Sequence, residues 1–401
     1  MYDIAIIGAG ASGTAAAISA KQVERSLSVI LIESLPKVGK KILATGNGRC
    51  NLTNLSAVSQ NYSSKAVSSV MKNYSPEKIV EFFSNIGLEC VSDNESRVYP
   101  MSNTANSVLD CLRYEIERLG VDVMNDSKVV SVCKKGNVFE IDGKIKCKKL
   151  IVATGGKASP SQGSDGSGYP LLRAFGHSVT ALYPGLVQLT VKENLKPLKG
   201  VRVKAAVSLR LKNGKELDSA TGEILFADYG LSGIAIMDVS RSVKNNECKC
   251  ILNILPELKK EDVYRFILQA KQRNSSLTAE DALCGIIPRK VGYLIIKNAG
   301  LRQDVTLNEL SNKDIDLLAE KLKNCEFTVT GTKGFENAQI TVGGASVNEF
   351  DMRTLESEKV SGLYCVGEIL DIDAPCGGFN LQWAWASGIV AGQSAAQSLT
   401  R

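Results

Sequence analysis

Apolar runs and glycine-rich turns alternate at the start of the chain. Residues 2–7 are mostly apolar, a glycine-rich turn follows, and residues 14–21 are rich in alanine, a strong helix former. Residues 27–32 form a second apolar run. This order predicts a strand, a tight turn, a helix and a second strand, which is the repeating unit of a parallel sheet.

The pattern changes in the middle of the chain. From Leu189 onward, short runs alternate between apolar and polar residues, with a hairpin signal at Asn213-Gly214. Residues 257–323 are more polar and have a helical pattern, and a strand-like piece returns at 326–330. These changes predict a β-rich and helical insert within the first domain.

The expected fold class is therefore α/β, a Rossmann-like domain interrupted by a β-rich, barrel-like domain with added helices. The predicted divisions are 1–188 and 343–401 for the two parts of the first domain, and 189–342 for the insert, with β-rich parts at 189–256 and 325–342 and a helical part at 257–324. Such an insert is placed to cover a ligand and to form a substrate pocket between domains.

Composition narrows the class of protein. A chain of 401 residues with 44% hydrophobic and 22% charged residues is an ordinary globular protein of two or three units. Its 11 cysteines, an odd number without a signal peptide, favour the reducing cytoplasm over a disulfide framework. No apolar run approaches the ~18 residues of a membrane span, so we expect a cytoplasmic protein without a membrane partner.

The net charge of +6 does not indicate a nucleic-acid groove. The Lys-rich segments 192–204 and 244–260 are interleaved with acids, and aromatic residues, which would stack on bases, make up 6% of the chain. We therefore expect a small-molecule substrate and no nucleic-acid partner. The sequence does not indicate an oligomeric state.

One histidine, His177, is present, which excludes a multi-histidine metal site. It follows an apparent helix end, where a histidine commonly interacts with the last carbonyls, so we expect a structural role. Cys248 and Cys250 lack a second cysteine pair at zinc-site spacing. No metal is predicted.

The first turn has the glycine spacing of a dinucleotide-binding loop. The first glycine allows the tight turn, the second lets the backbone approach a pyrophosphate, and the third lets the helix pack on the strand. The helix N-terminus then faces the phosphates. The expected phosphate-binding residues are Gly8, Gly10, Ala11, Ser12 and Gly13.

A carboxylate at the end of the second strand completes this pattern. Glu33 stands twenty positions after Gly13, where it can accept hydrogen bonds from an adenosine ribose. The long polar, glycine-rich loop that follows, together with apolar strands ending near residues 156 and 368, favours an extended cofactor. A second strand–glycine–helix unit and an active-site cysteine pair are both lacking, which argues against a disulfide reductase with its own pyridine nucleotide domain.

Four segments resemble one flavoprotein family, which contains aminoacetone oxidase and 3-dehydro-bile acid Δ4,6-reductase. They are Thr45–Asn54, Tyr229–Gly233, Gly367–Asp373 and Gly377–Ala384, and the resemblance extends over essentially the full chain. It implies bound FAD, with Gly46–Asn51 near the flavin. Cys376 is a departure, because threonine is common at this position of the family.

The cofactor-binding residues expected beyond the first turn come from the strand ends and the motifs of this family. They are Glu33, Lys41, Thr45, Gly46, Asn47, Arg49, Cys50, Asn51, Thr154, Gly155, Gly156, Gly367, Glu368, Gly378, Phe379, Asn380 and Leu381.

The last helix, predicted over 379–393, begins after the pair Gly377-Gly378. If its free amides face the N1 and C2 carbonyl side of the flavin, the helix end stabilises a reduced, anionic flavin. Trp383 and Trp385 in this helix are expected to be core aromatic residues. The candidate proton donors are Tyr229, Lys41 and Tyr99.

Three functions are consistent with these features. The first is reduction of a conjugated enone, small or steroid-like, with NADH or NADPH as a transient electron donor. The second is an amine oxidase of the aminoacetone type, which produces peroxide. The third is a non-catalytic FAD-binding redox sensor.

Overall fold

The computed structural model describes residues 1–400 and consists of two compact units. Unit 1 comprises residues 1–184 and the segment from Ala338 to the C-terminus, and unit 2 comprises Gly185–Asn337. Unit 2 is thus an insertion into unit 1. The α/β fold class, a Rossmann-type domain with an inserted barrel and helices, is confirmed.

Unit 1 contains the parallel strands and the longest helix. Its strands are β1 (Tyr2–Ile7), β2 (Val29–Ile32), β3 (Thr53–Asn54), β4 (Cys90–Ser92), β5 (Arg97–Pro100), β6 (Asp122–Met124), β7 (Val132–Lys135), β8 (Val138–Ile141), β9 (Ile145–Val152), β10 (Tyr183–Gly185), β17 (Ile340–Val342), β18 (Phe350–Asp351), β19 (Glu356–Ser357) and β20 (Leu363–Cys365). Its α-helices are α1 (Ala11–Val23), α2 (Ser68–Asn73), α3 (Pro76–Asn85), α4 (Ala105–Arg118), α5 (Gly168–Ala174) and α11 (Phe379–Thr400).

The central sheet of unit 1 has the strand order β18-β19-β20-β9-β1-β2-β6. The five strands from β20 to β6 run parallel, with Ile6 of β1 opposite Leu31 of β2 and Ile151 of β9. Strand β1 is fully paired on both sides, which explains its apolar sequence and its burial. The chain proceeds from β1 to β2 on one side and returns to β9 on the other, so the strand order reverses at β1.

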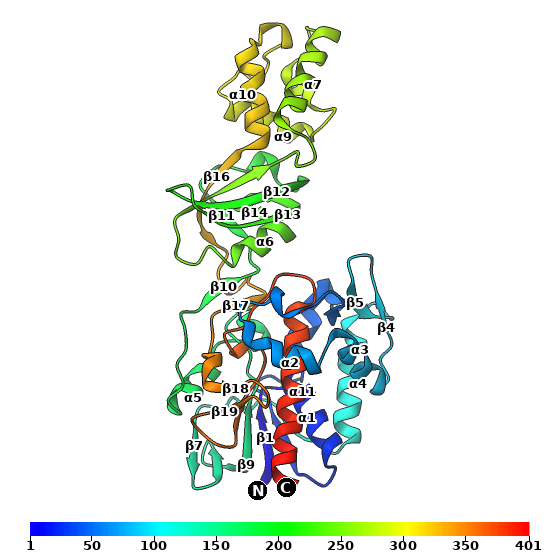
Figure 1. Ribbon diagram of the computed structural model, residues 1–401, viewed down its shortest axis with the longest axis vertical. Coiled ribbons are helices and arrows are strands. Elements are labelled where there is room, and N and C mark those ends of the chain that lie inside the picture. Colours follow the sequence, from blue (N-terminus) through cyan, green and yellow to red (C-terminus); the bar gives the residue numbers. More distant parts are fainter. Residues whose placement is uncertain (401) are drawn as a thin grey trace. The chain divides into compact units, whose positions relative to one another are not determined.

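Helices α1 and α11 pack directly against each other and against this sheet (Figure 1). The close approach of α11 to α1 depends on two glycines of α11. A Cβ on Gly388 would lie 2.2 Å from the carbonyl oxygen of Ser12, and a Cβ on Gly392 would lie 2.2 Å from the carbonyl oxygen of Ala16. The small side chains of α1 therefore serve close helix packing. Trp383 and Trp385 are buried in the core, as expected.

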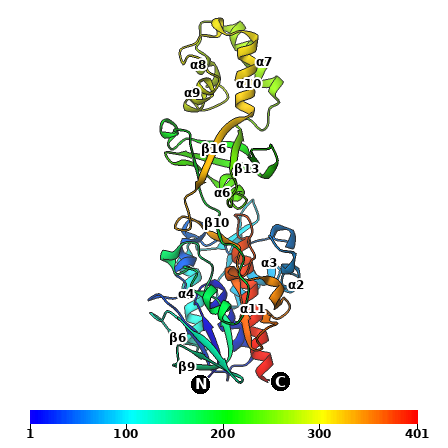
Figure 2. The same cartoon turned by 90° about the vertical axis from the view of Figure 1, so that its left-hand side faces the viewer.

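Unit 2 is built on a closed six-stranded antiparallel barrel in the order β11-β14-β13-β12-β15-β16. Its strands are β11 (Leu189–Val191), β12 (Arg202–Leu211), β13 (Glu216–Ala227), β14 (Gly230–Ser232), β15 (Cys248–Asn253) and β16 (Cys325–Thr332), and its helices are α6 (Ile234–Ser240), α7 (Lys260–Arg273), α8 (Ala279–Leu283), α9 (Arg289–Asn298) and α10 (Asn312–Lys323). Helices α7 to α10 gather beyond one end of the barrel (Figure 2) and share its core.

The longest hairpin of the barrel joins β12 and β13 through the turn predicted at Asn213-Gly214. Gly214 has φ +83°, and the Asn213 side chain accepts a hydrogen bond from Lys215 N at 3.0 Å. Both features are those that make Asn-Gly a favoured turn pair. Cys248 and Cys250 lie in β15 and are buried in the core of unit 2.

The segments that connect the two units are tied together within unit 1. Strand β17, which the sequence pattern assigned to the insert, pairs with β10. Farther along, Val179 forms a bridge with Ala345, and Thr180 N donates to Gly344 O at 2.9 Å. The chain therefore leaves and re-enters unit 1 along neighbouring backbone segments.

His177 has a structural role, but the contacts predicted for its side chain are wrong. Only its backbone N–H bonds a helix carbonyl, that of Leu172 in α5. The buried imidazole instead contacts Glu349 Oε2 through Nδ1 at 2.8 Å and Ser357 Oγ through Nε2 at 2.9 Å, and it stacks on the ring of Phe350. These partners are far away in sequence, and the local pattern around a helix end could not identify them.

Two features concern residues 1–400 as a whole. No helix in this range combines the length and apolar character needed to cross a bilayer. Nor do any three His, Cys, Asp or Glu side chains in this range lie together in a way that would hold a metal ion.

Candidate functional site

The carboxyl ends of four parallel strands meet where the strand order reverses. In open α/β sheets this is the place where ligands bind. The ends of β1 and β9 are in direct contact there, since a Cβ on Gly8 would lie 2.5 Å from the carbonyl oxygen of Ala153. The end of β20 reaches the same place, because a Cβ on Gly367 would lie 2.6 Å from Ser12 Oγ.

The N-terminus of α1 offers unpaired backbone donors at this edge. The first bond within the helix runs from Thr14 N to Gly10 O at 3.0 Å, so the amides of Ala11, Ser12 and Gly13 have no partner inside the helix. No side chain caps the helix and its first turn has no acidic residue. Such an end attracts an anion.

The three glycines of the turn have different surroundings. Gly8 has φ +99°, and a Cβ on Gly13 would lie 1.9 Å from Gly8 O, so both serve the turn and its packing. Nothing lies within 4 Å of a Cβ placed on Gly10. Gly10 is therefore the glycine that faces open space at the helix N-terminus.

Glu33 lies at the end of β2 with a buried carboxylate. Its Oε2 accepts a hydrogen bond from Ala9 N at 2.8 Å and its Oε1 accepts one from Leu35 N at 2.9 Å. These bonds hold the carboxylate against the glycine turn. Ser34 Oγ also donates to Oε1 at 3.2 Å, so Oε2 is the oxygen with a second lone pair left to accept a bond from a ribose hydroxyl.

Lys41 and Glu368 form an ion pair across the site. Lys41 Nζ lies 2.7 Å from Glu368 Oε2, and Glu368 Oε1 accepts a hydrogen bond from Thr341 N at 2.8 Å. A Cβ on Gly156 would lie 2.3 Å from Thr341 Oγ1 and 2.9 Å from Glu368 Oε1. The structure thus brings the loops after β2, β9 and β20 together around one largely buried ion pair.

The glycine-rich loop after β2 contains a 3₁₀ segment, η1 (Lys40–Gly48), interrupted at Thr45–Asn47. Gly46 and Asn47 both have left-handed backbone angles. Thr45 O accepts a hydrogen bond from Cys50 N at 3.0 Å, which closes the loop. Cys50 is fully buried, and burial raises the pKa of its thiol to about 12, so this thiol is protonated and unreactive at neutral pH.

An unsatisfied amide oxygen lies where this loop meets α11. Asn51 Oδ1 is buried and has no hydrogen-bond partner among the described residues. It lies 2.8 Å from the position of a Cβ on Gly378, which has φ +100°. The first intrahelical bond of α11 comes from Gln382 N, so the preceding backbone amides are free of helical partners.

The side chains at the start of α11 are largely occupied. Asn380 donates to Ala374 O at 2.9 Å and accepts from Ala374 N at 3.0 Å, which pins the preceding loop. Phe379 is buried, and its carbonyl accepts from Tyr62 Oη at 3.0 Å. Phe379, Asn380 and Leu381 therefore offer backbone amides to a ligand.

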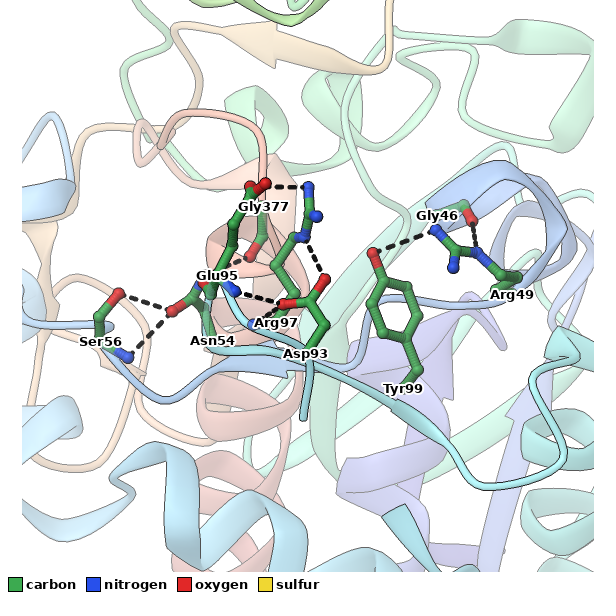
Figure 3. A network of polar contacts seen from close by, with 9 residues as sticks. All are labelled: Gly46, Arg49, Asn54, Ser56, Asp93, Glu95, Arg97, Tyr99 and Gly377. Atoms are coloured by element: carbon green, nitrogen blue, oxygen red, sulfur yellow. Dashed lines mark hydrogen bonds and ion pairs between the residues drawn. The ribbon is translucent and has the colours of Figure 1, made fainter. Parts of the chain in front are cut away.

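Two arginines lie beside this loop in different electrostatic surroundings (Figure 3). Arg97 pairs with Asp93 at 2.8 Å and Glu95 at 3.0 Å. Arg49 packs over the ring of Tyr99, with Cζ 4.4 Å from the ring centroid, and its polar contacts are Gly46 O at 3.4 Å and Tyr99 Oη at 3.5 Å. Only the charge of Arg97 is balanced by carboxylates.

The predicted site residues of unit 1 thus gather at one edge of the sheet. Thr154 and Gly155 lie there too, at the end of β9. Tyr229 belongs to unit 2, where it precedes β14 and Lys333 Nζ lies 5.0 Å from its ring centroid. Tyr229 therefore lies in the inserted unit, whereas Lys41 and Tyr99 lie in unit 1.

Two site residues were missed in the sequence. The hydroxyl of Ser164 is buried without a partner among residues 1–400, 2.9 Å from a Cβ placed on Gly155. Thr341 Oγ1 accepts hydrogen bonds from Lys157 N at 2.7 Å and Ala158 N at 3.0 Å. Ser164 stands in a conspicuous glycine-rich run, which was a usable signal, whereas no local pattern identified Thr341.

These features fit an extended dinucleotide such as FAD. Gly10 and the α1 amides would hold its phosphates, and Glu33 and Ser164 would contact the ribose side. The unsatisfied Asn51 oxygen and the free amides of α11 form a second set of polar groups, suited to the edge of a flavin ring. The groups around α1 therefore suit the adenine nucleotide half of FAD, and the groups around Asn51 and α11 suit the flavin half.

Comparisons with known proteins agree with this geometry. A family model described as HI0933-like protein Rossmann domain matches residues 2–394. The chain is similar to 3-dehydro-bile acid delta(4,6)-reductase of Clostridium scindens, with 38% identity covering 99% of this chain and 100% of the relative. It is also similar to ribosomal RNA dihydrouridine synthase of Escherichia coli, with 31% identity covering 96% of each.

Among solved structures, 3-ketosteroid delta1-dehydrogenase from Sterolibacterium denitrificans shares the fold. It matches with a TM-score of 0.50 at 14% sequence identity, covering 99% of both chains.

Proposed function

Because the chain belongs to the HI0933-like family and is an FAD-dependent oxidoreductase, we propose that it reduces a carbon–carbon double bond conjugated to a carbonyl group. The observation that carries this proposal is the full-length similarity to two relatives with related chemistry. One is named a reductase of a 3-dehydro-bile acid, and the other is named for making dihydrouridine. Both names describe saturation of a double bond in a ring that also carries a carbonyl.

The first substrate class that we propose is a steroid-like enone. The supporting relative has the higher identity, 38% over 99% of this chain. In the proposed reaction, one double bond, one reduced pyridine nucleotide and one proton give a saturated bond and an oxidised nucleotide. When bound, FAD would supply the two-electron chemistry that links the nucleotide to the substrate.

The side chains and amides of this chain bind, orient and supply the proton. The α1 amides and Glu33 hold the nucleotide end of the cofactor, while the free amides at the start of α11 favour negative charge near them, worth about 0.5–1 kcal/mol or more when shielded from water. Lys41 and Tyr99 are our proposed sources of the proton. The ion pair with Glu368 at 2.7 Å fixes the position of the Lys41 ammonium group. Tyr229, in unit 2, is the third candidate.

A uridine in RNA is a second candidate substrate, and the distribution of charge favours it. Unit 2 has 24 Lys and Arg against 19 Asp and Glu, so this insertion carries +5 of the net +6. Basic surfaces concentrate polyanions nearby. The sequence-based expectation of no nucleic-acid partner stays a prediction, and the 31% identity to a ribosomal RNA dihydrouridine synthase is the main support for the alternative.

The proposed donor is tested by anaerobic stopped-flow absorbance of the purified holoprotein with NADH and, separately, NADPH. Rapid loss of absorbance of the bound FAD, followed by its recovery on adding a steroid 4,6-dien-3-one, supports the proposal. Recovery on adding uridine-containing RNA instead selects the second substrate. An amine that removes the absorbance, with peroxide formed on admission of air, would replace the reductase by an oxidase.

A further inference from the structure

Arg49 is a cation at the candidate site that no acidic side chain neutralises. Among the described residues, no Asp or Glu pairs with it, whereas Lys41 pairs with Glu368 and Arg97 pairs with two acids. Its contacts at 3.4 and 3.5 Å are at the outer limit of hydrogen bonding. Most of its hydrogen-bonding capacity is therefore uncommitted.

The guanidinium is nevertheless held in place. It packs on the ring of Tyr99, with Cζ 4.4 Å from the centroid, and Tyr99 is only 7% exposed. A Cβ on Gly46 would lie 3.4 Å from Tyr99 Cε1 and 2.7 Å from Asn51 N, so ring, loop and Asn51 are packed together. A guanidinium stacked on an aromatic ring keeps its in-plane N–H groups available, which is the geometry that binds a carboxylate or phosphate.

Other groups already account for the anionic part of the cofactor. The unpaired amides of α1 face the end of β1 and suit the pyrophosphate. Arg49 lies instead on the loop that carries the unsatisfied Asn51 oxygen, next to Gly378 and the start of α11. Its charge is thus left for a different anion.

We propose that Arg49 is a substrate-binding residue whose guanidinium, supported by Tyr99, binds an oxyanion that the substrate carries besides its reacting double bond. This inference rests on the proposed function and narrows its substrate to an anion. A bile acid has a carboxylate and RNA has phosphodiesters, so both candidate substrates supply such a group. The charge on the substrate, in addition to the enone, determines which molecules react efficiently.

The test compares charged and neutral forms of one substrate. A 3-oxo-4,6-diene steroid acid is assayed against its methyl ester, and in a second arm a uridine-containing oligonucleotide is assayed against uridine. With Arg49→Gln, we expect kcat/KM for the charged member of the active pair to fall roughly 10–100-fold and that for the neutral member to change less than about 2-fold. The arm that shows this selectivity identifies the source of the anion.

Arg97→Gln is the matched control, because this neighbouring arginine already has its own carboxylates. It should leave the preference for the charged substrate intact. Tyr99→Phe keeps the aromatic ring, so the ratio of kcat/KM for the charged over the neutral substrate should be retained, although both values fall if the Tyr99 hydroxyl supplies the proton. Tyr99→Leu removes the support of the guanidinium and should reduce that ratio. The FAD dissociation constant and the rate of reduction by pyridine nucleotide are measured in every variant.

Two results would overturn the assignment. Equal losses of kcat/KM for charged and neutral substrates would show that Arg49 does not bind the charged group. A weakened FAD affinity in Arg49→Gln would assign the arginine to the cofactor. If the wild-type protein reduces no enone, the proposed function fails by itself. Binding of the saturated steroid acid and of the oligonucleotide, followed through the absorbance of bound FAD, then decides about Arg49: equal affinity in wild type and Arg49→Gln for both probes refutes its role.

Discussion

Gly10 and Gly13 belong to one turn, yet the structure predicts opposite effects of replacing them by alanine. A methyl group on Gly13 would lie 1.9 Å from Gly8 O, whereas one on Gly10 would meet nothing within 4 Å. Gly10 also has an extended backbone, φ −80° and ψ −162°, which alanine can adopt. One glycine is therefore needed by the fold and the other is free to serve a ligand.

The magnitudes follow from these contacts. Gly13→Ala gains about 1 kcal/mol of helix propensity but must displace a backbone carbonyl, so we expect a net loss of roughly 3 kcal/mol, equivalent to about 6–12 °C in Tm. Gly10→Ala changes a helix N-cap and should cost at most about 1 kcal/mol, or about 2–4 °C. Its methyl group should lower FAD affinity at least about tenfold, or 1.4 kcal/mol.

The assay separates folding from binding. Thermal unfolding is followed by circular dichroism after removal of FAD, and affinity is measured by titrating FAD into each refolded apoprotein. The reasoning is refuted if Gly10→Ala binds FAD as tightly as the wild type, since the phosphates would then not approach this glycine. An apoprotein of Gly13→Ala as stable as the wild type would equally contradict the packing argument.

Three further predictions concern charged groups of unit 1. Burial lowers the pKa of His177 below 6.5. Its contribution to stability should therefore be complete above about pH 6.5 and be lost as the pH falls toward the lower folded-state pKa. Urea unfolding from pH 8 to 5.5 should show this fall in the free energy of unfolding, and His177→Gln should reduce it. Burial alone would raise the pKa of Glu349, but hydrogen bonds from Lys359 and its other neighbours outweigh this effect and lower the pKa to about 2. A second loss of stability should therefore begin below pH 4.5 and be absent in Glu349→Gln. Lys41→Met should cost less than about 1 kcal/mol of stability, because both partners of the ion pair with Glu368 are about a quarter exposed, whereas turnover should fall more than tenfold if Lys41 supplies the proton. Denaturant unfolding beside steady-state kinetics checks this, and a large stability loss with normal turnover would contradict it.

Local sequence predicted the parts of the fold that depend on neighbouring residues. The strand, turn and helix from residue 2 to residue 23 follow from periodicity and glycine spacing, and the β12–β13 hairpin follows from its Asn-Gly turn. The carboxylate of Glu33 could be placed because it ends the next strand.

Contacts between distant segments could not be predicted in this way. Lys41 and Glu368 are 327 positions apart, and His177 and Glu349 are 172 apart. Each residue is ordinary in its own segment, and its role depends on which loops the sheet brings together. The unsatisfied oxygen of Asn51 is a property of packing and has no counterpart in the sequence.

The insertion of unit 2 also determines the order in which the chain can fold during synthesis. Unit 2 is continuous and ends at Asn337, so all its strands are made while 64 residues of unit 1 are still missing. At about 5–20 residues per second, β20 and α11 follow about 3–13 seconds later. Until then β9 lacks its partner β20, and α1 lacks α11, which packs on it. Apolar surface of β9 and α1 therefore stays uncovered during this interval, so unit 1 completes its core after unit 2 has been made.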